Sequence, residues 1–82
     1  MNLKDTVALM CSDSYKDRLK AEYWQVRNRY DKLVRVLTSA SQRALNIPED
    51  QQELMQKQAH YMYHYMITLS ERCKLEGINL ND

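Results

Sequence analysis

The sequence predicts an all-α fold: a short N-terminal helix followed by a long antiparallel helical hairpin that assembles as a homo-oligomeric helical bundle. Three observations support this: two long apolar stripes at helical spacing, a single proline and a single glycine, and a length of only 82 residues. Residues 1–82 are expected to form one domain. Domains this small usually need disulfides, a metal or further copies of the chain for stability.

The first expected element is a short helix over residues 3–10, with Leu3, Val7 and Met10 at helical spacing. A helix of this length is not stable alone in water. We therefore expect it to dock on the rest of the chain.

The first long helix is expected over residues 14–44. Its apolar side chains recur in steps of four and three, which keeps them on one face because successive residues rotate by ~100°. Ser14 can cap its N-terminus, and Asp17 suits its first turn. Hydroxyl side chains weaken its end, so residues 38–47 either continue the helix or form a loop. The stripe comprises Leu19, Tyr23, Val26, Tyr30, Leu33, Leu37, Ala40 and Ala44.

The second long helix is expected over residues 48–75. Pro48 suits a first helical position, two acidic residues follow it, and Gly77 is the stop signal. Its apolar stripe comprises Met55, Ala59, Met62, Met66, Leu69 and Cys73.

Apolar side chains outside the two stripes predict a homo-oligomer. A hairpin can bury one stripe of each helix, and the remainder would form an exposed patch of the kind that marks interfaces. The alternative is that these side chains thicken the core of a monomer. They are Trp24, Val34, Val36, Tyr61, Tyr63 and Tyr65.

The formal net charge is +1, but the two halves differ in sign. Residues 13–45 carry eight basic and four acidic side chains, whereas residues 46–82 carry three basic and six acidic ones. Opposite charges favour antiparallel pairing, although an exposed pair contributes only ~0.2–1 kcal/mol. Without a net basic field, duplex nucleic acid is not an expected partner.

The cysteines and the hydropathy indicate a reducing, cytoplasmic setting. Cys11 and Cys73 are not expected to form a disulfide, because Cys73 lies on an apolar stripe and no secretory signal is recognisable. No apolar run approaches the ~20 residues that a membrane span requires, so no membrane partner is expected.

Few residues have the pattern of a catalytic or metal site. His60 and His64 have the spacing of a metal-binding pair, but Tyr61 stands where such a zinc motif needs an acid. An ordinary place among aromatic side chains is the alternative, and the role of this pair stays open. Cys73 has only Arg72 and Lys74 beside it to activate its thiol. We therefore expect no enzyme, no catalytic residue, no metal and no cofactor.

Candidate ligand-binding residues gather near the start of the first long helix. Aromatic rings stack on bases, while guanidinium and ammonium groups pair with phosphates. A small anionic nucleotide is the expected ligand, preferably where two subunits meet. The alternative is that Tyr23 belongs to the core and the cations form a solvated face. The predicted site comprises Tyr15, Lys16, Arg18, Lys20, Tyr23, Trp24 and Arg27.

Three segments, YKDRLKAEYWQ at 15–25, RYDKL at 29–33 and LSERCKLEGI at 69–78, resemble a phage-encoded helical-hairpin family of the crAss-like-phage type. That family's arrangement is similar to the hairpin of phage anti-defence sponges, which counter CBASS and Thoeris immunity by sequestering nucleotide second messengers in oligomer pockets. The resemblance implies a homo-oligomer in the host cytoplasm. It also implies that Tyr15 with Lys16 or Lys20 holds the ligand.

These observations favour a phage anti-defence protein that sequesters a nucleotide immune signal, such as a cyclic oligonucleotide or an ADP-ribose derivative, without catalysis. The rival hypothesis is a protein-binding hairpin that inhibits a host defence enzyme or serves as a phage assembly module. In the leading hypothesis Arg18, Lys20 and Arg27 hold phosphates, and Tyr15, Tyr23 or Trp24 stacks on a base.

Overall fold

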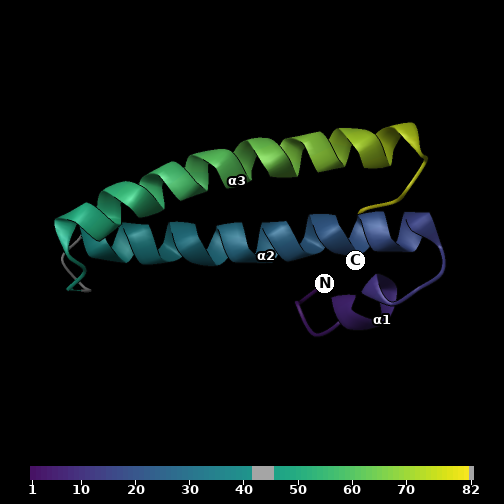
Figure 1. Ribbon diagram of the computed structural model, residues 1–82, viewed down its shortest axis with the longest axis horizontal. Helices are drawn as coiled ribbons and strands as arrows, with labels where there is room; N and C mark the ends of the chain where they lie inside the picture. The colour runs from purple at the N-terminus through teal and green to yellow at the C-terminus, as the bar shows by residue number, and fades with distance from the viewer. Residues whose placement is uncertain (42–45, 82) are drawn as a thin grey trace.

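The computed structural model describes residues 1–41 and 46–81, and within these ranges the chain forms three helices and no strand. Helix α2 spans Tyr15–Ser41 and α3 spans Glu49–Leu75; they lie side by side in opposite directions (Figure 1). The short helix α1, Thr6–Met10, packs against α2. The molecule measures 43 × 23 × 18 Å. This arrangement confirms the predicted all-helical hairpin.

The N-terminal helix is shorter than the sequence predicted. It begins at Thr6 and not at residue 3, because residues 3–5 form a turn. The Asp5 N–H donates to the Asn2 side-chain oxygen at 2.8 Å, and the Asn2 N–H donates to the Asp5 carboxylate at 3.2 Å. This reciprocal pair holds the turn in place of a first helical turn.

The two long helices begin close to their predicted positions. Helix α2 starts directly after Ser14, whose hydroxyl oxygen accepts a backbone N–H of the first turn at 3.5 Å. Helix α3 starts at Glu49, so Pro48 precedes the helix and is not its first residue. The predicted end of the first long helix at residue 44 falls within residues 42–45, which lie outside the described residues.

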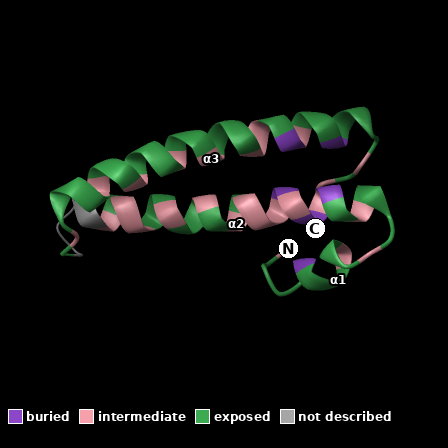
Figure 2. Ribbon diagram, viewed as in Figure 1, coloured by how far each residue is buried: buried purple, intermediate pink, exposed green. Residues whose placement is uncertain are grey.

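The two predicted apolar stripes face each other, and each of their side chains that the structure describes is buried or half-buried. Burial is uneven along the hairpin (Figure 2). The end where α2 starts and α3 finishes, here called the compact end, holds the buried cluster Leu19, Tyr23, Leu69 and Cys73. The end formed by residues 30–41 and 49–62, here called the open end, holds no buried residue among those described.

Helix α1 is attached to α2 through the completely buried side chain of Thr6. The Thr6 hydroxyl donates to the Leu3 carbonyl at 2.6 Å and accepts from Gln25 Nε2 at 3.1 Å. Asn28 Nδ2 donates to the Met1 carbonyl at 2.8 Å. These bonds hold the N-terminal segment along α2.

A Schellman motif closes the C-terminus of α3. The Ile78 N–H donates to the Cys73 carbonyl at 2.9 Å, and the Gly77 N–H donates to the Lys74 carbonyl at 3.2 Å. Gly77 has a φ of 68°, in the left-handed region that the motif requires. Ile78 then packs against the buried cluster, so the motif turns the C-terminal tail back over the compact end.

Replacing Gly77 with alanine is expected to lower the free energy of unfolding by about 1 kcal/mol. The cost is one of backbone conformation, because an added Cβ would meet no atom within 4 Å. Asparagine tolerates the left-handed region better and should cost less. Urea denaturation followed by circular dichroism measures both variants; equal losses for alanine and asparagine would contradict this explanation.

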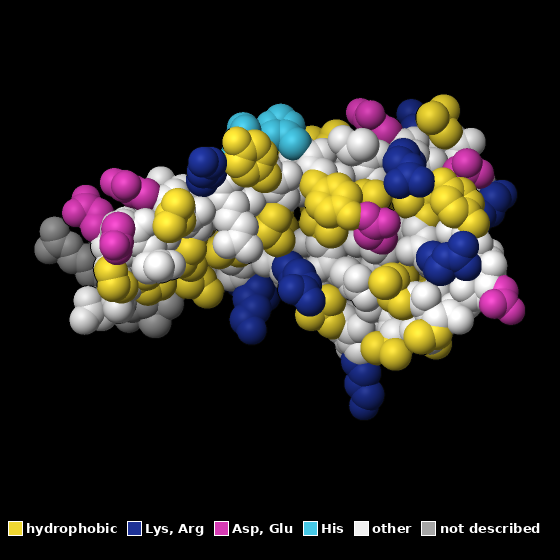
Figure 3. All heavy atoms as spheres, viewed as in Figure 1, with side chains coloured by type: hydrophobic (Ala, Val, Ile, Leu, Met, Phe, Trp, Pro, Cys, Tyr) yellow, Lys and Arg dark blue, Asp and Glu magenta, His cyan; other side chains and the backbone are white. Residues whose placement is uncertain are grey.

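The outer surfaces of the long helices mix apolar and charged side chains, as one face shows in Figure 3. Tyr61, Tyr63 and Tyr65 of α3 are 61%, 44% and 45% exposed, and Leu54 is 60% exposed. Within residues 1–41 and 46–81, no helix has both the length and the apolarity needed to pass through a lipid bilayer.

Candidate functional site

Three of the seven predicted ligand-binding residues contact one another at the compact end. Tyr23 is only 8% exposed and belongs to the buried cluster. The Arg27 guanidinium lies 5.0 Å from the centre of the Trp24 ring, and its Nη1 donates to the Tyr23 hydroxyl at 3.1 Å. The Tyr23 ring therefore serves the core, as the alternative interpretation of the sequence held.

The remaining four predicted residues lie on the surface of α2 or near it. Arg18 Nη1 donates to the Ser12 carbonyl at 2.8 Å. Lys16 is exposed and Lys20 is half-buried. Three cavities in the described part of the molecule lie elsewhere, and none of the seven residues lines them. The structure does not bring the seven together in one pocket.

One flank of α2 is joined to α3 by a ladder of paired side chains. At its first position, Arg72 Nη2 donates to the Tyr15 hydroxyl at 2.7 Å, and the guanidinium lies 6.0 Å from the ring centre. At its second position, seven residues further along each helix, the Tyr65 hydroxyl donates to the Glu22 carboxylate. We call this series of pairs the interhelical ladder.

The third position of the interhelical ladder is open. Another seven residues along each helix, it holds Arg29 on α2 and Gln58 on α3, and both side chains line the same groove. Among the residues that the structure describes, the Arg29 guanidinium has neither a hydrogen bond nor an ion pair. The regular pairing that closes the first two positions therefore stops here.

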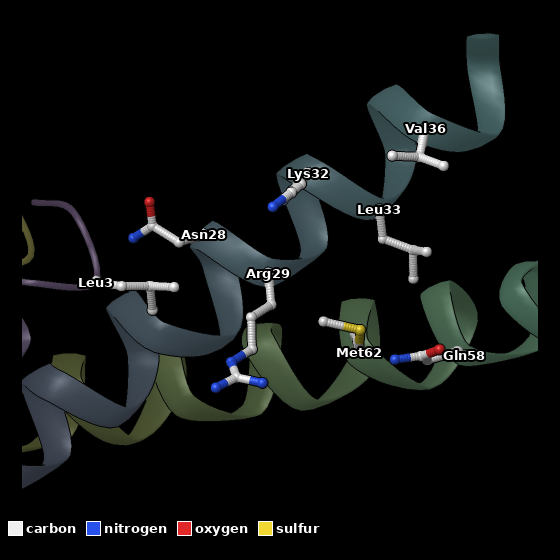
Figure 4. A pocket seen from close by; sticks show the side chains of 8 residues that line it. All are labelled: Leu3, Asn28, Arg29, Lys32, Leu33, Val36, Gln58 and Met62. Carbon is white, nitrogen blue, oxygen red and sulfur yellow. The ribbon is translucent and has the colours of Figure 1, made fainter. Parts of the chain in front are cut away.

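The groove at this position has a volume of about 520 Å³ and opens to solvent between α2 and α3. This volume falls within the ~300–1,000 Å³ that small-molecule sites occupy. Figure 4 shows the Arg29 and Leu33 side chains leaving α2 on the side of α3. No carboxylate lines the groove, so its two cations are not neutralised there. The lining residues are Leu3, Asn28, Arg29, Lys32, Leu33, Val36, Gln58 and Met62.

Arg29 and Gln58 were not among the predicted site residues, because they lie on different helices and outside the cluster of basic and aromatic residues along one helix. The signal that could have found them is a seven-residue interval present on both helices. Positions 15, 22 and 29 pair in antiparallel order with positions 72, 65 and 58.

Comparison with protein families matches residues 13–75 to the family model described as Sequestin. The chain belongs to the Sequestin family. The Sequestin match includes the whole of α2 and α3 and leaves out α1. Comparison with curated proteins and with solved structures found no match.

The Sequestin match contains every groove residue that lies on a long helix, whereas Leu3 lies outside it. The groove is thus built on the Sequestin hairpin, and the N-terminal segment adds one wall to it. The crAss-like-phage type that the resemblance implies is a finer assignment than Sequestin membership and stays a prediction.

His60 and His64 of this Sequestin-family chain lie edge to face, with ring centres 4.6 Å apart. The rings of Tyr61 and Tyr63 lie 5.4 Å from His60 and 5.6 Å from His64, respectively. In residues 1–41 and 46–81, no group of three or more His, Cys, Asp or Glu side chains could hold a metal ion. The geometry is that of an exposed aromatic cluster.

Cys73 is completely buried in the Sequestin hairpin. Burial raises the pKa of the Cys73 thiol; Arg72 opposes the rise, Glu22 adds to it and Lys20 opposes it. Since the thiolate is the nucleophilic form, this thiol behaves as a small apolar side chain.

Thiol labelling at about pH 8 is expected to modify the exposed Cys11 quickly and Cys73 slowly. The raised pKa of the Cys73 thiol keeps it protonated in the folded chain at a pH where the same thiol is ionised in the unfolded chain. The folded state therefore loses stability as the pH rises through this range. Mass spectrometry of a Cys11→Ser variant over time measures the Cys73 rate, and labelling as fast as that of Cys11 would contradict the prediction.

Proposed function

We propose that this protein binds and sequesters a nucleotide second messenger of host immunity without altering it, as a phage anti-defence protein in the host cytoplasm. The observation that carries the proposal is the groove beside Arg29, which joins unneutralised cations to apolar walls within the Sequestin-matched hairpin. The family name, which points to sequestering a ligand, agrees with it.

The chemistry of the groove supports binding a nucleotide. Guanidinium and ammonium groups attract phosphates, and the apolar walls suit the face of a base. The lining contains no histidine, cysteine, aspartate or glutamate. Such side chains are the usual general bases, so the groove is better suited to holding a ligand than to converting it.

We propose that copies of the chain associate through the open end of the hairpin. The stripes there are only half-buried, and Val34, Leu54 and Tyr61 are 37%, 60% and 61% exposed. Burial of this exposed apolar surface against a second copy of the chain would stabilise so small a domain. Light scattering coupled to size exclusion should give a multiple of 9.8 kDa, and a monomer at all concentrations would contradict this part of the proposal.

Isothermal titration of the assembled protein against cyclic di-AMP, cyclic di-GMP, a cyclic triadenylate and ADP-ribose tests the proposed function. We expect saturable heat with at least one of them. Heating the complex should then return the same compound unchanged, as chromatography would show. No heat with any of them, or release of a cleaved product, would contradict the proposal.

The exposed tyrosines of α3 favour a second candidate function, a hairpin that binds protein and so inhibits a host defence enzyme or serves in phage assembly. Tyrosine is enriched at protein interfaces because its ring offers apolar area and its hydroxyl a hydrogen bond. This candidate predicts that Tyr61→Ala and Tyr65→Ala abolish anti-defence activity in cells while nucleotide binding is absent from the unaltered protein.

A further inference from the structure

We propose that the third position of the interhelical ladder is the phosphate-binding site of the sequestered nucleotide, with Arg29 as the residue that holds the phosphate. This inference rests on the proposed function and names the side chains that perform it. The ligand is thus placed at the third ladder position and not at residues 15–27, where the sequence predicted it.

Three other arginines already have partners, whereas Arg35, which has none among the described residues, lies off the interhelical ladder and lines two other cavities. Arg72 donates to Tyr15, Arg18 donates to the Ser12 carbonyl, and Arg27 donates to Tyr23 and lies 3.9 Å from the Asp31 carboxylate. A guanidinium bound in this way must give up an existing contact to take a ligand.

Arg29 is in a different position. It occupies the same flank and the same seven-residue series as Tyr15 and Glu22, yet the residue opposite it, Gln58, gives it no hydrogen bond. A guanidinium presents five donors in a planar fork that matches two phosphate oxygens. The open ladder position therefore leaves that fork available inside a groove.

The walls of the groove indicate what accompanies the phosphate. Leu33 and Met62 present apolar surface beside Arg29, while Gln58 offers an amide that can donate and accept hydrogen bonds. Lys32, three residues after Arg29, places a second cation on the same lining. A nucleotide matches this arrangement. Its base would lie against the apolar wall with its edge on Gln58, and its one or two phosphates would lie on the two cations.

The size of the groove restricts the class further. About 520 Å³ suits one nucleotide unit and not a nucleic acid duplex. A larger cyclic signal would place one of its nucleotide units here and leave the others to a neighbouring copy. The ligand class assigned to this groove is thus a nucleotide bearing one or two phosphates, free or as part of a cyclic signal.

Methionine methyl groups offer a direct test, because Met62 lines the groove whereas Met10 lies on α1. The probes are ADP, ADP-ribose and inorganic pyrophosphate, titrated into protein labelled with ¹³C at its methionine methyls. We expect ADP and ADP-ribose to shift the Met62 resonance saturably and to leave Met10 unmoved. Pyrophosphate, which lacks a base, should bind more weakly.

Three variants give the assignment its controls. Arg29→Gln should weaken ADP binding by about 10- to 100-fold. Arg29→Lys keeps the charge but not the planar fork of donors, so its affinity for ADP should lie between those of the unaltered protein and Arg29→Gln. Lys74→Gln removes the same charge from the exposed end of α3 and should bind like the unaltered protein. Circular dichroism verifies that each variant remains folded.

Each outcome decides between the two proposals. Met62 shifts with ADP that depend on Arg29, without binding of ADP-ribose or of any cyclic signal, would support the site and contradict sequestration of those signals. Binding of a signal without a Met62 shift, or a greater loss in Lys20→Gln than in Arg29→Gln, would overturn the site and leave sequestration standing. No shift and no binding would overturn both.

Discussion

Replacing Leu69 with alanine is expected to lower the free energy of unfolding by about 2–5 kcal/mol. Leu69 is 1% exposed and lies in the buried cluster with Leu19, Tyr23 and Cys73. Because that cluster is confined to the compact end, the described residues of the hairpin offer no second cluster of buried hydrophobic side chains to offset the loss. A domain of this size has a total stability of only about 4–12 kcal/mol, so much of the variant should be unfolded near physiological temperature.

The matched control is Leu75→Ala, which makes the same change in the same helix at a side chain that is 89% exposed. It should change the stability by less than about 0.5 kcal/mol. Thermal unfolding followed by circular dichroism at 222 nm, the helical band, compares the two. Equal effects would mean that the compact end is not the core of the hairpin.

The second large effect is expected for Thr6→Val, at about 1–3 kcal/mol. Valine has nearly the same shape, so the change removes the hydroxyl and little else. Gln25 then loses the oxygen to which its Nε2 donates, and the Leu3 carbonyl loses one of its two donors and keeps the Thr6 backbone N–H at 3.2 Å. We expect the N-terminal segment to detach from α2, and the groove to lose the wall that Leu3 supplies.

Thr68→Val is the control for this prediction, because the exposed Thr68 hydroxyl also donates to a backbone carbonyl, that of His64, at 2.9 Å. It should be nearly neutral. The single tryptophan, Trp24, directly precedes Gln25 in α2 and has its indole Nε1 shielded from solvent, so its fluorescence reports the change. Unchanged stability and emission in Thr6→Val would show that these hydrogen bonds do not hold the segment.

The hairpin could be predicted because one spacing rule governs both long helices. Steps of three and four place Leu19 and Tyr23 on one face and Leu69 and Cys73 on the other helix's face, and these are the residues that the structure buries. The stop after α3 was equally readable, since Gly77 adopts the left-handed conformation that a helix end requires.

The groove beside Arg29 was harder to predict, because it depends on how two distant segments face each other. Periodicity shows which side of α2 is apolar, but the partner of a flanking residue depends on the register with α3. Glu22 meets Tyr65 in that register, whereas Arg29 meets a glutamine that leaves it unpaired. Trp24 and Arg27, which look like a ligand site along the sequence, contact each other instead.

The measurement that tests the central claim most directly is native mass spectrometry of the protein mixed with the signal that gives heat in the titration. We predict an oligomer of the 9.8 kDa chain carrying that compound at its intact mass, and an Arg29→Gln oligomer of the same copy number without it. A monomer without ligand, or an oligomer that carries a hydrolysis product, would contradict the account.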